Sequence, residues 1–279
     1  TDPVVEYFHK YVVASIVESG AAPVSAGGTE LITGSLATVT SFDYTGGAAW
    51  AKPTGALVKP AEVTYSDFRG FATVTTTIGT GTESSRARVT YYRGIGTQLT
   101  GGPTGYQLTV TDREPYQGQV FLSTTLNGST PTSEVVTVPG EPVVVADDGA
   151  GNKATRIPST STYSFSYDAA GAPVHRTSQA KTFNQNAQLS TINDLGDLTT
   201  ATDDTCTALT YAHTTSPALA AKNLVTLVAE TRVLAKSCAS TPVIPDDLIS
   251  QVQSTYDGSG RLLRTDRLDP TDGVGFILG

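Results

Sequence analysis

Apolar and polar residues alternate with the two-residue period of β-strands through most of the chain. Short runs rich in Val, Ile, Tyr, Phe and Thr are separated by clusters of Gly, Pro, Asn and Asp roughly every ten residues. This pattern predicts an all-β protein made of antiparallel hairpins. The predicted strands cover residues 4–17, 36–44, 62–65, 71–78, 86–92, 107–111, 119–126, 134–138, 142–146, 160–167, 172–178, 188–193, 209–212, 224–234, 250–256 and 261–267.

Turn signals lie between these runs. Gly79-Thr80-Gly81 and Asn127-Gly128 are typical of hairpin turns, and Asp147-Asp148-Gly149 predicts a further turn. Two longer stretches, 21–28 and 45–60, are rich in Gly and Pro. The first is a predicted loop. The second, which contains the single tryptophan, Trp50, is predicted to be a loop or a broken edge strand.

Helix is expected at no more than two short places, 217–222 and 246–252, and Asp246 or Asp247 could cap the second. No shift in composition marks a domain boundary. We therefore expect one continuous region over residues 1–279, with a possible seam near 147–158.

Composition supports the all-β prediction. Threonine is unusually common, with about 45 residues, and Thr, Val and Tyr suit a pleated, half-buried surface. Lys+Arg number 18 against 26 Asp+Glu, and the sequence pI is near 4.8. This acidic balance argues against nucleic acid and against an anionic membrane surface as partners. No apolar run approaches the ~20 residues of a membrane-spanning helix, so membrane insertion is not expected.

The chain begins at Thr1 and contains no methionine. We therefore expect a fragment or a processed product, whose export signal lies upstream or was removed. The absence of methionine would suit an oxidising exterior, where thioethers become sulfoxides.

Cys206 and Cys238 are the two cysteines, and their spacing does not resemble a metal site. In an exported protein they would form a disulfide worth roughly 3–4 kcal/mol in the chain-entropy model. In the cytosol they would be two buried thiols. We favour the disulfide because the rest of the composition is typical of an extracellular protein.

Two segments of the chain resemble each other. Residues 165–174 contain Tyr167-Asp168-Ala-Ala-Gly171, and residues 254–263 contain Tyr256-Asp257-Gly-Ser-Gly260-Arg261-Leu. Weaker copies lie at 190–198 and 42–46. Each copy predicts a hairpin: Tyr supplies a large inward ring, Asp accepts hydrogen bonds from backbone N–H groups two residues on, and Gly supplies a positive φ.

This arrangement resembles the YD repeat of the Rhs family. Residues 256–262 match the family pattern Tyr-Asp-x-x-Gly-Arg-Leu throughout, whereas residues 167–171 match its first half. Residues 63–74, 89–94 and the segment around Cys206 and Cys238 are similar to actinobacterial-type members. The resemblance implies a strip of β-hairpins that curves or spirals into a hollow shell. In the family such shells enclose a toxin carried by the same polypeptide or display binding surfaces outside the cell.

Few side chains form a pattern typical of a catalytic, metal or cofactor site. His9, His175 and His213 are isolated, and no metal or cofactor is expected. The acid pairs Asp147-Asp148, Asp203-Asp204 and Asp246-Asp247 are interpreted as turn residues. The carboxylates of neighbouring strand residues point to opposite faces, so such a pair does not converge.

Three further residues are candidate ligand contacts. Arg69 and Arg93, each followed by Gly, are expected to pair with nearby acids or to contact a cargo. Trp50, with Tyr44 and Tyr65, could form a sugar-stacking platform or could anchor a loop.

The sequence favours a non-enzymatic, secreted or cell-surface protein. The leading hypothesis is an Rhs-like shell segment that encapsulates, presents or delivers a cargo. Its partners would be other segments of its own polypeptide or the enclosed cargo. The alternatives are a carbohydrate-binding surface module or adhesin, and a self-assembling filament subunit that associates through open sheet edges.

Overall fold

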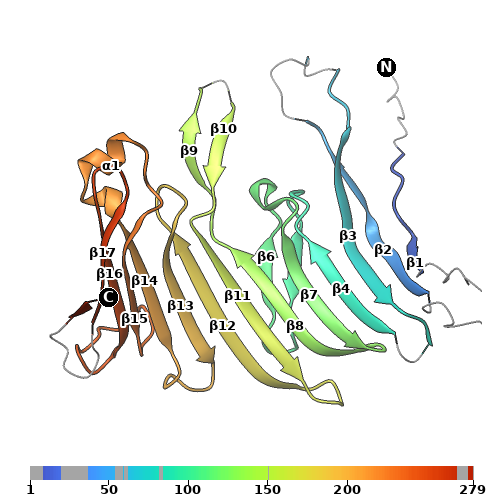
Figure 1. Ribbon diagram of the computed structural model, residues 1–279. Helices are drawn as coiled ribbons and strands as arrows, with labels where there is room; N and C mark the ends of the chain where they lie inside the picture. The colour runs from blue at the N-terminus through green and yellow to red at the C-terminus, as the bar shows by residue number, and fades with distance from the viewer. Residues whose placement is uncertain are drawn as a thin grey trace, which may run out of the picture. The chain divides into compact units, whose positions relative to one another are not determined.

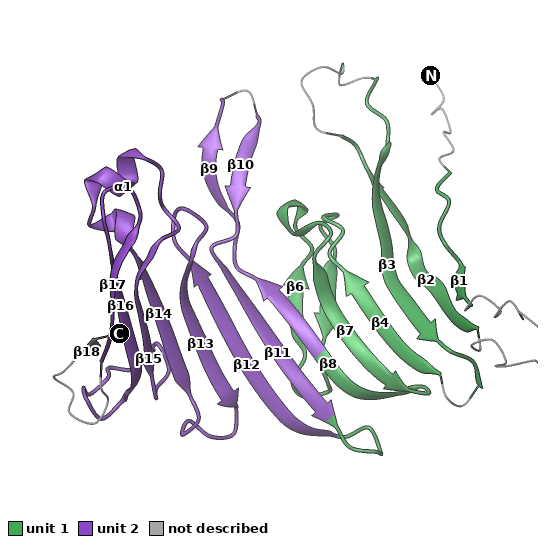
Figure 2. Ribbon diagram, in the orientation of Figure 1, with its two compact units in different colours: residues 1–134, 167–172 green, residues 135–166, 173–279 purple. Residues whose placement is uncertain are grey.

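The all-β prediction is confirmed by a computed structural model, which describes residues 9–19, 37–53, 59, 62–81, 84–149, 151–268 and 276–278 (Figure 1). The chain divides into two compact units (Figure 2). The first unit comprises residues 1–134 and 167–172, and the second comprises residues 135–166 and 173–279. Residues 147–158 contain a hairpin turn that lies within the second unit. The continuous region over 1–279 and the possible seam near 147–158 both stay predictions.

The first unit is an antiparallel sheet in which consecutive strands are neighbours, in the order β1-β2-β3-β4-β7 followed by the start of β8. Antiparallel strands can be joined by tight turns, so the meander follows chain order except where a separate hairpin is inserted before β7. The strands are β1 (Ser15–Glu18), β2 (Thr38–Ala51), β3 (Asp67–Ile78), β4 (Ser85–Tyr91), β7 (Val120–Asn127) and β8 (Thr130–Pro139), with β5 (Gln98–Gly101) and β6 (Leu108–Thr111) forming a separate hairpin.

Strand β2 decides one open prediction. Residues 45–60 were predicted to be a loop or a broken edge strand, and β2 continues to Ala51 through a bulge at Gly46 and Gly47, both with positive φ. A second register shift follows between Ala49 and Trp50, and Trp50 pairs with Phe68 on β3. A different prediction was wrong, because residues 62–65 form no strand and β3 begins at Asp67.

The core of the first unit lies where residues 92–119 leave β4 and return to β7. The backbone groups of Tyr92 and Gln119 bond at 2.9 Å and close this excursion. The rings of Tyr92, Tyr116 and Phe121 are almost wholly buried, and Tyr92 contacts the other two at 5.3 and 5.4 Å between centroids. Asp112, also fully buried, accepts hydrogen bonds from the backbone N–H groups of Arg93 and Gly94 at 3.0 and 2.7 Å.

The second unit is a longer meander in which β11 to β18 are neighbours in chain order. A separate hairpin, β9–β10, projects from it (Figure 1). Its strands are β9 (Val143–Asp147), β10 (Lys153–Arg156), β11 (Ser159–Tyr167), β12 (Pro173–Phe183), β13 (Leu189–Asp197), β14 (Thr205–Tyr211), β15 (Val228–Leu234), β16 (Leu248–Tyr256), β17 (Leu262–Leu268) and β18 (Phe276–Leu278).

Helix is short in the second unit. The expected helix at 217–222 is present as α1 (Pro217–Ala221). The expected helix at 246–252 was wrong, because these residues enter β16 at Leu248 and pair with β15. Among the described residues, no helix is long and apolar enough to cross a membrane.

The predicted disulfide is present between Cys206 and Cys238. Cys206 lies on β14 and packs with the buried side chains of Leu234, Leu248 and Leu268. The backbone N–H of Cys238 donates to Asn193 Oδ1 at 2.7 Å. The disulfide therefore ties the loop after β15 to the hydrophobic core of the second unit.

Candidate functional site

The complete Tyr-Asp repeat forms the turn between β16 and β17. The Asp257 carboxylate accepts hydrogen bonds from the backbone N–H groups of Ser259 and Arg261, at 2.8 and 3.0 Å, and from Arg261 Nε at 2.7 Å. Two backbone bonds between Asp257 and the residues Gly260 and Arg261, each 2.9 Å, close the loop. Gly260 has a φ of +82°, which an L-residue adopts only with strain.

The half-matching repeat has the same geometry between β11 and β12. Asp168 Oδ1 accepts hydrogen bonds from the backbone N–H groups of Ala170 and Ala172, both at 2.9 Å. Gly171 has a φ of +83°. The replacement of Arg-Leu by Ala-Pro after this glycine therefore leaves the turn unchanged.

A third turn of this kind was missed by sequence reasoning. Between β12 and β13, Asn184 Oδ1 accepts hydrogen bonds from the N–H groups of Asn186 and Gln188 at 2.9 and 3.1 Å, and Ala187 has a φ of +58°. The segment Phe183-Asn184-x-x-Ala187-Gln188-Leu189 is a conservative variant of Tyr-Asp-x-x-Gly-Arg-Leu. Alanine at the glycine position concealed the copy.

A fourth turn joins β9 to β10. Asp148 Oδ1 accepts a hydrogen bond from the N–H of Asn152 at 3.0 Å, and the N–H of Asp148 donates to the Asn152 carbonyl at 3.2 Å. Gly151 has a φ of +101°. The two weaker copies expected from the sequence are not turns, because residues 42–46 lie within β2 and residues 190–197 lie within β13.

The tyrosines of the repeats connect each hairpin to an earlier strand. Tyr256 OH donates to the Val228 carbonyl on β15 at 2.9 Å, and Tyr167 OH donates to Glu134 Oε2 on β8 at 2.6 Å. Burial and the hydrogen bond to Glu134 raise the pKa of Tyr167. The repeat thus uses its polar groups to hold the sheet together.

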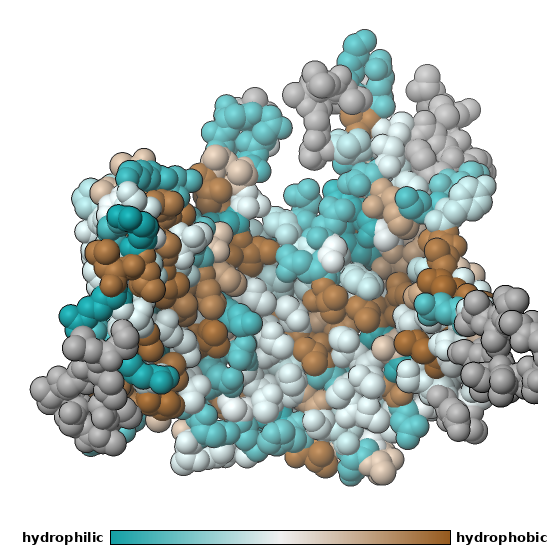
Figure 3. Space-filling model, in the orientation of Figure 1, coloured by the Kyte–Doolittle hydropathy of each residue, from teal (hydrophilic) through white to brown (hydrophobic). Residues whose placement is uncertain are grey.

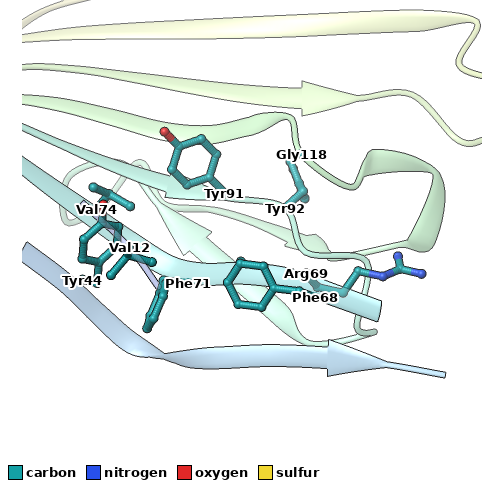
Figure 4. A pocket seen from close by; sticks show the side chains of 10 residues that line it. Val12, Tyr44, Phe68, Arg69, Phe71, Val74, Tyr91, Tyr92 and Gly118 are labelled. Atoms are coloured by element: carbon teal, nitrogen blue, oxygen red, sulfur yellow. The ribbon is translucent and has the colours of Figure 1, made fainter. Parts of the chain in front are cut away.

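A pocket of about 320 Å³ lies in the first unit (Figure 4). Its walls are largely aromatic and aliphatic side chains, namely Val12, Tyr44, Phe68, Phe71, Val74, Tyr91 and Tyr92. The rings form a row: Tyr44 contacts Phe71 at 5.0 Å, Phe71 contacts Phe68 at 6.1 Å, and Phe68 contacts Trp50 at 5.0 Å between centroids. Such a pocket suits an apolar group.

The candidate ligand contacts lie around this row. Trp50 packs on Phe68 and is half-buried, whereas Tyr65 is 57% exposed under the Lys52 ammonium. The expected group of Trp50, Tyr44 and Tyr65 is therefore replaced by a row in which phenylalanines separate Tyr44 from Trp50.

The two arginines differ in their contacts. Arg69 lines the pocket and pairs with acids as expected, with Nε 2.6 Å from Asp67 Oδ2 and Nη2 3.7 Å from Glu114 Oε1. Arg93 Nη1 instead donates to the Gly47 carbonyl at 3.2 Å, across the bulge of β2. Arg69 thus links β3 to the segment after β6, and Arg93 links the segment after β4 to β2.

Among the described residues, the histidines and the acid pairs do not gather into one cluster. His175 Nδ1 is 3.2 Å from Asp197 Oδ2, and His213 Nε2 is 3.0 Å from Asn186 Nδ2. Asp247 pairs with Lys236 at 2.7 Å, and this contact lowers the pKa of Asp247. Within the described part of the chain, no group of three His, Cys, Asp or Glu side chains could hold a metal ion.

The fold is similar to the crystal structure of TcdB2-TccC3. The TM-score is 0.52 at 11% sequence identity, and the match covers 83% of this chain and 15% of that chain. The likeness supports a distant Rhs-like fold, in agreement with the Tyr-Asp turns. No protein-family model matches the sequence, and no curated protein matches it. The fold therefore belongs to the class of all-β proteins built as a strip of antiparallel hairpins. The chain spans only 15% of the length of its structural neighbour.

Proposed function

We propose that this chain is a non-enzymatic structural segment of an exported Rhs-type shell. In this role the strip surrounds, presents or delivers another segment of its own polypeptide or a separate cargo. The observation that carries the proposal is the repeated turn. Four hairpins close with an Asp or Asn side chain bonded to the backbone, centred on Asp148, Asp168, Asn184 and Asp257.

The repeated turn favours a structural role because it occupies the polar side chains. The carboxylates of Asp168 and Asp257 accept backbone hydrogen bonds, and the repeat tyrosines donate to neighbouring strands. Groups used in this way hold the sheet rather than a substrate. A meander with such turns can be lengthened hairpin by hairpin, which is what a curved wall requires.

Export is supported by the disulfide. Cys206 and Cys238 are bonded to each other, and disulfides persist in oxidising compartments outside the cytosol. The likeness to TcdB2-TccC3 points the same way. Both observations support a secreted or cell-surface protein.

The aromatic pocket of the first unit supplies a contact surface for the enclosed segment. Tyr91 lines the pocket, whereas Tyr65 is an exposed tyrosine of the same unit that does not line it. A photoreactive phenylalanine analogue placed at either position is close to tyrosine in size. The two positions therefore form a matched pair for cross-linking in cells that make the protein from its natural gene.

We expect irradiation to link position 91, and not position 65, to a polypeptide outside residues 1–279 or to a co-produced protein. Mass spectrometry of the product identifies that partner. Equal products at the two positions, or none at position 91, contradict the cargo role. Light scattering and negative-stain microscopy of the purified chain supply the second test. Curved, discrete particles agree with the proposal, whereas open-ended regular filaments contradict it.

A further inference from the structure

A segment outside the sheet borders the aromatic pocket of the first unit. Residues 9–14, which we call the strap, precede β1 and form neither helix nor strand. The strap lies against two members of the aromatic row, Phe68 and Tyr44. Figure 3 shows hydrophobic surface around β1 and β2, where the strap joins the sheet. The strap is thus a stretch of unpaired chain that rests on an apolar surface.

The strap presents alternate side chains to the aromatic row, as an extended peptide does. Lys10 Nζ lies 5.4 Å from the centre of the Phe68 ring, and Val12 lines the pocket (Figure 4). The side chain between them, Tyr11, is 97% exposed. The aromatic surface therefore receives a cation and an aliphatic group two residues apart, and a ring face attracts a cation through its quadrupole.

The fit of the strap to the pocket is incomplete. The Val13 carbonyl accepts a hydrogen bond from Tyr44 OH at 2.9 Å, and the Ala14 carbonyl accepts one from Phe42 N–H at 2.9 Å, so the backbone is held at its β1 end. Val12, however, is 43% exposed and has a pocket of about 320 Å³ beside it. Its isopropyl group therefore borders the pocket without filling it.

We propose that the strap occupies the place of an extended polypeptide partner that carries a Lys or Arg and, two residues later, a large apolar side chain. The cation of the partner lies over Phe68 in place of Lys10, and its apolar side chain enters the pocket in place of Val12. A Leu, Ile or Phe side chain buries more apolar area there than valine does, so the partner displaces the strap. The net charge of -8 also attracts a cationic partner.

The inference rests on the proposed function, because it names the chemistry of the segment that the aromatic pocket contacts. The two nevertheless fail separately. Cross-linking at position 91 tests whether a natural partner reaches the pocket in cells. Peptide affinities of the purified chain test which side chains the pocket recognises and whether the strap competes with them.

Peptide binding to the purified full chain tests the chemistry of the partner. The probe is a fluorescein-labelled peptide with the sequence of residues 9–15, and fluorescence anisotropy measures its dissociation constant. Phenylalanine in the peptide at the position of Val12 should tighten binding at least about fivefold, because the larger side chain fills more of the pocket. Glutamate in the peptide at the position of Lys10 should weaken binding by a similar factor, because a ring face repels an anion.

Substitutions in the strap itself should act on peptide binding in the opposite direction, because a tethered strap competes at a high effective concentration. Val12→Phe in the chain strengthens the strap and should weaken binding of the peptide at least about fivefold. The double variant Lys10→Ala/Val12→Ser weakens the strap and should tighten binding by about as much. The matched control, Lys59→Ala/Val144→Ser, changes an exposed lysine and an exposed valine outside the strap and should leave the affinity unchanged.

Opposite shifts from the same substitution in the peptide and in the chain support the inference. Equal affinity of the wild-type chain and the Lys10→Ala/Val12→Ser chain overturns it, because the strap then does not compete. So does a Lys10→Ala/Val12→Ser chain that binds no peptide, or one that binds the glutamate peptide as tightly as the lysine peptide. Circular dichroism of each variant separates a change in binding from a loss of folding.

Discussion

The positive-φ position of the repeated turn provides a direct test of how the fold is built. Gly260 holds this position in the complete repeat with a φ of +82°, and Ala187 holds it in the concealed repeat with a φ of +58°. The same turn therefore contains the favourable residue in one copy and an unfavourable one in the other. Exchanging them should change stability in opposite directions.

The magnitudes follow from the backbone and from the surroundings. An L-residue in the left-handed region costs about 1–2 kcal/mol, so Gly260→Ala should lower the free energy of unfolding by about that amount. A Cβ at Gly260 would lie 3.0 Å from Leu224 Cδ1 and 3.3 Å from Leu227 Cδ1, and these flexible side chains can yield. Ala187→Gly removes the strain but adds chain entropy to the unfolded state, so it should stabilise by about 0.5–1 kcal/mol.

Urea unfolding at neutral pH, followed by circular dichroism, measures both changes. Gly128→Ala is the matched control, because Gly128 has a φ of +60° and a Cβ there would meet nothing within 4 Å. It should show the backbone cost alone. A Gly260→Ala chain as stable as the wild type, or an Ala187→Gly chain that is less stable, would refute the assignment of these turns to one motif.

Three further outcomes are expected. Reducing the Cys206–Cys238 disulfide should lower the free energy of unfolding by roughly 3–4 kcal/mol in urea titrations, and an unchanged midpoint argues against a structural role. Hydrogen bonds from the Arg261 backbone, the Arg261 guanidinium and the Ser259 backbone lower the pKa of Asp257 to about 2. The stabilisation that the Asp257 carboxylate gives to the fold should therefore be complete above pH 3.9, about the pKa of an unfolded Asp, and should be lost as the pH falls through about 2. A pKa near 3.9 for Asp257 in an NMR titration would contradict this expectation. Phe121→Ala should cost about 3–5 kcal/mol because the ring is 1% exposed, and a loss below about 1 kcal/mol in urea unfolding would show that the ring is not part of the core.

Much of the strand pattern could be predicted because it depends on neighbouring residues. Alternation and turn residues located the hairpins, and the Asp168 and Asp257 turns followed from motifs whose hydrogen bonds close within five residues. The Asn184 turn escaped because Ala187 replaces the glycine that marks the motif. There the Asn184 side chain and the flanking strands hold a conformation that alanine alone disfavours.

The places where the prediction stayed open or was wrong have tertiary causes. Gly46 and Gly47 resemble the end of a strand, but pairing with β3 carries β2 through them as a bulge. Residues 246–252 resemble a short helix, but pairing with β15 draws them into β16. In both places hydrogen bonds to a distant segment outweigh the local preference.

The aromatic pocket, on which the proposed function depends, could not be predicted from local sequence pattern. The aromatic pocket joins Val12, Tyr44, Phe68 and Tyr91, which come from three strands and the segment before β1. Its existence depends on the register between those strands, which is set by long-range pairing. The disulfide could not be decided from the sequence either, because the spacing of Cys206 and Cys238 allowed a disulfide or two free thiols. The fold decides it by bringing β14 next to the loop after β15. Local sequence thus specifies the hairpins through bonds within a few residues, while packing between hairpins specifies which side chains meet.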